Sequence, residues 1–126
     1  MGIYSTYLLP GIAFVLTVGT GIWLSRLGKP LNGVLFTVHK LIALGAVIAA
    51  ALPLASNLRS AAAPALALVL LVVGGLGFVA LFATGALLSL NPSSAVGSLH
   101  WVHRIAPLVV VVTVGWALVL LVGARG

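Results

Sequence analysis

The residues most able to do chemistry in this 126-residue chain are its three histidines, His39, His100 and His103. Two of them recur: a gapless shift of 64 residues places Val38-His39-Lys40 on Val102-His103-Arg104. Imidazole is a common metal ligand, and two opposed imidazoles can complete the coordination of a six-coordinate haem iron. The spacing therefore predicts a paired site at which His39 and His103 bind one metal-containing cofactor.

The histidine pair belongs to a longer internal repeat. Between residues 11–54 and 75–118, 14 of 44 aligned positions are identical, where this composition alone would give about five. Thr20-Gly21 aligns with Thr84-Gly85 in the same register. Each copy is long enough for two membrane spans, and a two-span repeat keeps its orientation in the bilayer. The two histidines are therefore expected at equal depth, on either side of an axis along the membrane normal.

Two cations and two glycines accompany the histidines. Lys40 and Arg104 follow them directly, in a chain that has no Asp or Glu. Their charges need an anion from outside the chain, and the two propionates of a haem would supply it. The alternative is that both side chains reach lipid phosphates. Gly21 and Gly85 are expected at the histidine end of their spans, where missing side chains would leave room for a flat ligand.

His100 precedes His103 by one helical turn, and its repeat position holds Phe36 instead of a histidine. Three roles stay open for it: an alternative axial ligand, a hydrogen-bonding group near the propionates or a quinone, or an interfacial residue without a ligand. The interfacial interpretation also competes at His39 and His103. A copper or zinc site made by all three histidines is a further alternative, although membrane metal sites usually recruit carboxylate or sulfur as well.

The composition of the chain indicates a membrane protein. Hydrophobic residues make up 63% of the chain and charged residues 5%, which is typical of integral membrane proteins. The scattered cations form no basic stripe, so a nucleic-acid partner is not expected. The absence of cysteine excludes iron–sulfur ligation and covalent haem attachment. No carboxylate can orient a histidine for nucleophilic catalysis, and enzymatic activity stays undecided.

Four apolar runs, each of about 20 residues or more, predict four transmembrane helices. They cover about residues 5–25, 33–54, 64–90 and 97–122, with Asn32 as a cap of the second run, Pro53 near its end and Asn91–Ser94 as a break after the third. The predicted fold is an all-α, integral membrane four-helix bundle. It forms a single domain over residues 1–126, made of two tandem two-helix repeats at about 5–60 and 64–124.

Positive charges beside the spans predict an orientation. Four cations are expected on the histidine side and two on the other: Arg26, Lys29, Lys40 and Arg104 against Arg59 and Arg125. Because cytoplasmic loops carry an excess of Lys and Arg, this favours termini outside and the first and third loops inside. The expected location is a bacterial inner membrane, in contact with lipid.

With histidines placed on two of four spans, the chain resembles small four-helix membrane b-type cytochromes, in which histidines on two helices hold haem inside the bundle. The resemblance rests on the architecture of most of the chain and on His39 and His103, not on a long motif. It implies one haem b with both histidines as iron ligands. Familiar di-haem members need four ligands, whereas three histidines on one side imply a single haem near one face.

The resemblance also implies a role in electron transfer. The chain would exchange electrons with a quinone or with a partner redox protein, as a homo-oligomer or as a subunit of a larger membrane complex. Two other classes of function stay open. One is a cofactor-free accessory or assembly subunit of a membrane complex, and the other is a carrier that binds haem or metal exchangeably.

Overall fold

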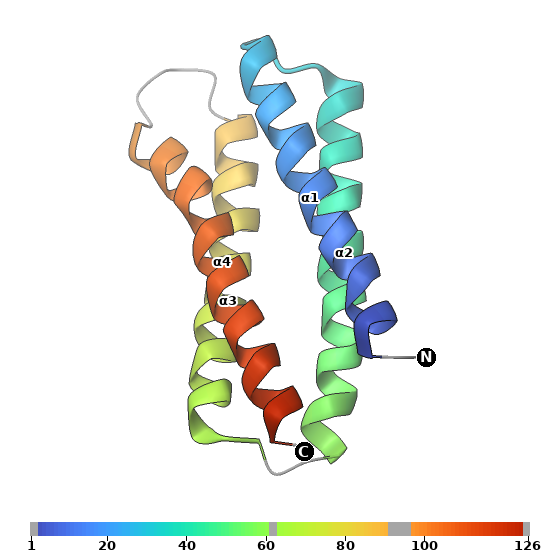
Figure 1. Cartoon of the computed structure of the whole chain (residues 1–126). Helices are drawn as coiled ribbons and strands as arrows, with labels where there is room; N and C mark the ends of the chain where they lie inside the picture. Colours follow the sequence, from blue (N-terminus) through green and yellow to red (C-terminus); the bar gives the residue numbers. More distant parts are fainter. Residues whose placement is uncertain (1–2, 61–62, 91–96, 125–126) are drawn as a thin grey trace. The chain divides into compact units, whose positions relative to one another are not determined.

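The computed structural model describes residues 3–60, 63–90 and 97–124. Over these residues the chain forms four long helices and no strand (Figure 1): α1 (Ile3–Leu27), α2 (Gly33–Ser60), α3 (Ala65–Leu90) and α4 (Gly97–Gly123). Each helix contains a stretch that is long and apolar enough to cross a membrane. The prediction of an all-α chain with four candidate spans is confirmed.

The helices pair in sequence order into two hairpins, α1 with α2 and α3 with α4 (Figure 1). The chain divides into two compact units, Met1–Ser56 and Asn57–Gly126, with the boundary in the last turns of α2. Two tandem helical hairpins, as the internal repeat predicts, are therefore confirmed.

Local residues set where the helices begin and end. Asn32 caps α2 as predicted, because its Oδ1 accepts a hydrogen bond from the Leu35 N–H at 3.0 Å and its carbonyl accepts one from the Phe36 N–H at 2.9 Å. Gly28 directly follows α1 with a φ of +73°. This left-handed conformation ends helices and favours glycine, because a Cβ would be strained there.

The second helix extends beyond the predicted span of 33–54. The sequence predicts an end near Pro53 and the polar residues 56–60, and α2 runs through the proline to Ser60, the last of these residues. The Ser56 hydroxyl donates to the Pro53 carbonyl at 2.8 Å, and continued helix satisfies the backbone groups that an apolar surrounding would leave unpaired. α3 ends at Leu90 as predicted. The predicted break at Asn91–Ser94 and the cation Arg125 lie outside the described residues.

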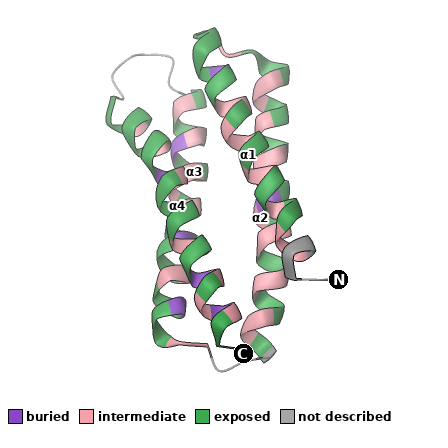
Figure 2. Ribbon diagram, in the orientation of Figure 1, coloured by how far each residue is buried: buried purple, intermediate pink, exposed green. Residues whose placement is uncertain are grey.

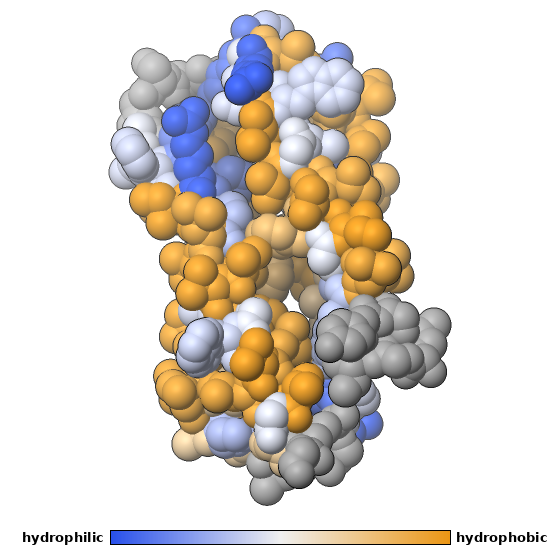
Figure 3. Space-filling model, viewed as in Figure 1, coloured by the Kyte–Doolittle hydropathy of each residue, from blue (hydrophilic) through white to orange (hydrophobic). Residues whose placement is uncertain are grey.

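Both hairpins leave large apolar side chains on their outer surfaces. Buried residues are sparse in Figure 2, and Leu8, Val34 and Leu90 are 63%, 77% and 76% exposed. In Figure 3 apolar residues cover most of the face that is shown. Such helices suit hydrocarbon, which removes the cost of exposing apolar groups to water. The chain is therefore an integral membrane protein in contact with lipid.

Glycines bring α3 and α4 close together. A Cβ added to Gly74 would lie 2.6 Å from Val114 Cγ2, and one added to Gly77 would lie 2.7 Å from Val110 Cγ2. Atoms this close would overlap, so each valine methyl occupies the space that a side chain on α3 would need. Close packing of this kind holds helices together in lipid, where no hydrophobic effect drives their association.

We expect Gly77→Ala to destabilise the α3–α4 hairpin, because its methyl group would overlap the Val110 side chain. Overpacking of this kind typically costs about 1–3 kcal/mol. The first repeat has Ala13 and Ala46 at the positions that correspond to Gly77 and Val110. The double variant Gly77→Ala/Val110→Ala adopts these residue types and should recover most of the loss. Thermal unfolding in detergent, followed by circular dichroism, measures both effects.

Gly75→Ala is the matched control for this experiment. Nothing lies within 4 Å of a Cβ added to Gly75, and alanine favours a helix more than glycine does. The Gly75→Ala variant should therefore unfold at the wild-type temperature or above it. If Gly77→Ala were equally well tolerated, the contact with Val110 would not limit the packing of these helices.

Candidate cofactor-binding site

In the first hairpin, His39 on α2 lies against α1. Its half-buried ring places Nδ1 at 3.0 Å from Thr20 Oγ1, and it has a further hydrogen-bonding contact with the backbone of Thr17. A Cβ added to Gly21 would lie 3.0 Å from His39 Cε1. Thr20 therefore forms a hydrogen bond with Nδ1 of the His39 ring, and the absence of a side chain at Gly21 leaves room for that ring.

The second hairpin holds His103 in the same way. Its Nδ1 lies 2.9 Å from Oγ1 of Thr84, a residue that is only 6% exposed. A Cβ added to Gly85 would lie 3.2 Å from His103 Cε1. We call Thr20, Gly21 and His39, and likewise Thr84, Gly85 and His103, a Thr–His–Gly unit. Each hairpin contains one such unit, with matching contacts at matching repeat positions.

Sequence reasoning missed the threonines. The Thr20 hydroxyl contacts the Leu16 carbonyl at 2.8 Å in addition to the histidine ring. The Thr84 hydroxyl contacts the Ala80 carbonyl at 2.6 Å. The signal that could have found both threonines was present, because each is identical in the repeat and precedes the glycine to which a role was given.

Gly21 and Gly85 have a neighbour other than the one expected. The sequence predicts room for a flat ligand beside them, whereas an imidazole carbon lies 3.0 Å from a Cβ added to Gly21 and 3.2 Å from one added to Gly85. The glycines therefore make room for the histidine side chain itself. The two glycines therefore affect the position of the imidazole rings, whose nitrogen atoms are the candidate metal ligands.

The cations next to the histidines are exposed. Lys40 Nζ lies 4.6 Å from the centroid of the Phe36 ring, one turn earlier on α2, which is a cation–π contact. Arg104 is exposed at the corresponding place on α4. The chain has no Asp or Glu to neutralise either residue, so a carboxylate or phosphate from outside the chain could pair with both.

His100 is exposed near the start of α4. Among the described residues, no group of three or more His, Cys, Asp or Glu side chains could hold a metal ion. His39 and His103 are each a candidate metal ligand, one in each hairpin.

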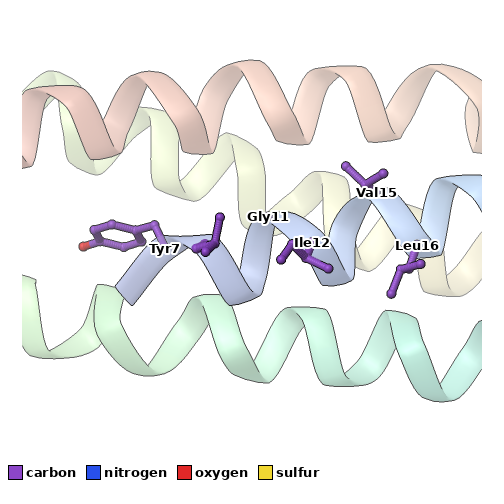
Figure 4. Close-up of a pocket in the computed structure, with 6 residues that line it drawn as sticks. Tyr7, Gly11, Ile12, Val15 and Leu16 are labelled. Atoms are coloured by element: carbon purple, nitrogen blue, oxygen red, sulfur yellow. The ribbon is translucent and has the colours of Figure 1, made fainter. Parts of the chain in front are cut away.

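Two shallow apolar depressions lie elsewhere on the helices. One follows α1, where Figure 4 shows its lining: Tyr7, Leu8, Gly11, Ile12, Val15 and Leu16. The other lies on the α3–α4 hairpin and includes Trp101 and Val102. Neither is lined by a histidine, so neither adds a metal-ligating imidazole to the candidate site.

The chain matches no protein-family model, no curated protein and no solved structure. Its function must therefore be argued from the site. Each hairpin offers one imidazole, a ligand type that haem iron accepts, whose Nδ1 is engaged by threonine, and an exposed cation follows each imidazole in sequence. A hydrogen bond that orients the ring of a histidine ligand is a usual feature of metal sites.

Proposed function

We propose that this chain is a membrane b-type cytochrome subunit in which His39 and His103 are the axial ligands of one haem b. The observation that carries the proposal is the Thr–His–Gly unit, which occurs once in each hairpin with the same contacts. A single histidine in a span is compatible with an interfacial role. Two histidines held alike, one for each hairpin, match the two axial positions of one iron.

The chain's own residues have distinct roles in this proposal. His39 and His103 hold the iron, and Gly21 and Gly85 let each imidazole lie against the neighbouring helix. Lys40 and Arg104 pair with the two propionates, which supply the anions that the chain lacks. When bound, the haem supplies one-electron transfer, because two histidines leave no coordination position open for oxygen.

The proposal extends to the surroundings of the site. The exposed apolar faces contact lipid or other subunits, in a homo-oligomer or a larger membrane complex. A quinone or a partner redox protein exchanges electrons with the chain, and His100, exposed one helical turn before His103, is a candidate hydrogen-bonding group for a quinone. The excess of cations on the histidine side favours termini outside, in a bacterial inner membrane, with the single haem near the cytoplasmic face.

The first test is the absorption spectrum of the detergent-purified chain, air-oxidised and then reduced with dithionite. We expect sharp α and β bands after reduction, and one haem b per chain by the pyridine haemochrome assay. The reason is that two imidazole ligands give a six-coordinate iron. A preparation that stays colourless after haem is added would overturn the proposal in favour of a cofactor-free accessory subunit. Weak, readily exchanged haem would favour a carrier.

A further inference from the structure

Each threonine hydroxyl of the Thr–His–Gly units lies within hydrogen-bonding distance of a histidine ring and of two backbone carbonyls, those of Leu16 and Thr17 for Thr20 and those of Ala80 and Leu81 for Thr84. A threonine hydroxyl has a single hydrogen to donate, and a backbone carbonyl can only accept. The shortest of the three contacts in both hairpins is to the carbonyl four residues earlier: Thr84 Oγ1 lies 2.6 Å from the Ala80 oxygen, and Thr20 Oγ1 lies 2.8 Å from the Leu16 oxygen. The hydroxyl proton therefore goes to the helix backbone.

This assignment decides which ring nitrogen carries a proton. Because the hydroxyl proton is already donated, the oxygen can only accept from the histidine Nδ1, which lies 3.0 Å away at His39 and 2.9 Å away at His103. In the opposite arrangement, the threonine oxygen and a carbonyl oxygen would face each other at 2.6 Å with no proton between them. The neutral ring therefore has hydrogen on Nδ1 and a lone pair on Nε2.

We infer that Thr20 and Thr84 are positioning residues that hold His39 and His103 in the Nδ1-protonated tautomer, with Nε2 as the donor atom for a metal. The identity of that metal as haem iron rests on the proposed function, whereas the tautomer does not. The hydrogen bond also fixes the orientation of each ring. Gly21 and Gly85 have no side chain, so each imidazole can pack directly against the neighbouring helix. Such partners orient a ligand and increase its basicity.

The tautomer can be measured on the full chain without a cofactor. We would label the histidines with nitrogen-15 and record their ring-nitrogen signals at a pH of about 8, where an ordinary histidine is neutral. We expect protonated Nδ1 at His39 and His103. Thr20→Val should shift the Nδ1–H signal of His39, because the ring loses the threonine oxygen and keeps its contact with the Thr17 backbone, and should leave the His103 signal unchanged. Thr84→Val should shift the His103 signal and leave that of His39 unchanged. Thr20→Ser keeps the hydroxyl and should preserve the wild-type signal.

Thr17→Val is the matched control. The Thr17 hydroxyl also donates to its own helix, at 2.8 Å from the Ala13 carbonyl, so the substitution removes the same kind of helix contact one turn away. Thr17→Val keeps the Thr17 backbone, which contacts the His39 ring, and should therefore leave the His39 signal unchanged. An unprotonated Nδ1 at His39 in the wild-type chain, or a Thr20→Val chain with the wild-type Nδ1–H signal, would overturn the inference.

A second readout follows in the haem-loaded chain. A more basic imidazole stabilises the ferric state, so losing the hydrogen bond in Thr20→Val should raise the haem midpoint potential, while Thr20→Ser should leave it near the wild-type value. A midpoint potential that is insensitive to both variants would contradict a positioning role. A chain that shows the expected tautomers and binds no haem would refute the proposed function and leave the role of the threonines supported.

Discussion

Replacing His39 with alanine should abolish the stoichiometric retention of haem. The variant removes one of two axial ligands, and no neighbouring Asp, Glu or Cys can replace it, because the chain contains none. The loss of affinity should exceed the roughly 10–100-fold effect of changing a residue that only supports a ligand. His103→Ala should behave alike, because both histidines make the same contacts. The measurement is haem per chain after gel filtration, with absorption spectra of both oxidation states.

His100→Ala is the control for this experiment, since His100 is exposed and belongs to neither Thr–His–Gly unit. It should retain haem at the wild-type ratio. Free imidazole should restore part of the six-coordinate spectrum to His39→Ala by occupying the vacated position, which separates the loss of a ligand from a failure to fold. A full, unchanged haem spectrum in His39→Ala would show that the ligand assignment is wrong.

Replacing Gly21 with leucine should have the second largest effect, because it fills the space that the His39 ring occupies. Even the Cβ of a new residue would lie 3.0 Å from His39 Cε1, so the ring has to move away from α1. The move separates His39 Nδ1 from Thr20 and misdirects Nε2. We expect haem retention to fall toward that of His39→Ala, and Gly21→Ala to cause a smaller loss. Haem titration into purified variants measures both.

Gly19→Leu is the matched control, on the same helix two residues away. Gly19 is exposed, and nothing lies within 4 Å of a Cβ added there. The Gly19→Leu variant should bind haem as the wild-type chain does and unfold at a similar temperature. Normal haem binding by Gly21→Leu, with His39 still required, would mean that the ligand does not need its position against α1.

Several features were predictable because they depend on residues close together in sequence. A run of about 20 apolar residues predicts a span wherever it occurs, and a capping side chain such as Asn32 acts within one turn of its helix. The hairpin pairing follows from short connections between consecutive helices. The end of α2 was not predictable from Pro53 alone, because the helix is sustained by an apolar surrounding that allows no unpaired backbone groups.

The contacts of the candidate site were only partly predictable. The repeat singles out His39, His103, Gly21 and Gly85 as matching residues, but nothing in it says which of them meet. The spans are apolar on all sides, so no hydrophobic stripe indicates which face of α1 packs against α2. The contact between Thr20 and His39, 19 residues apart, depends on how each helix is rotated about its own axis.

The sequence by itself determined the class of this protein, its four spans and the recurrence of a histidine at one place in each repeat. These properties follow from composition and from comparing the chain with itself. Only the tertiary structure decided that Thr20 and Thr84 engage the histidines and that Gly21 and Gly85 accommodate their rings. The physical reason is that both facts are contacts between neighbouring helices, which depend on the packing of their side chains.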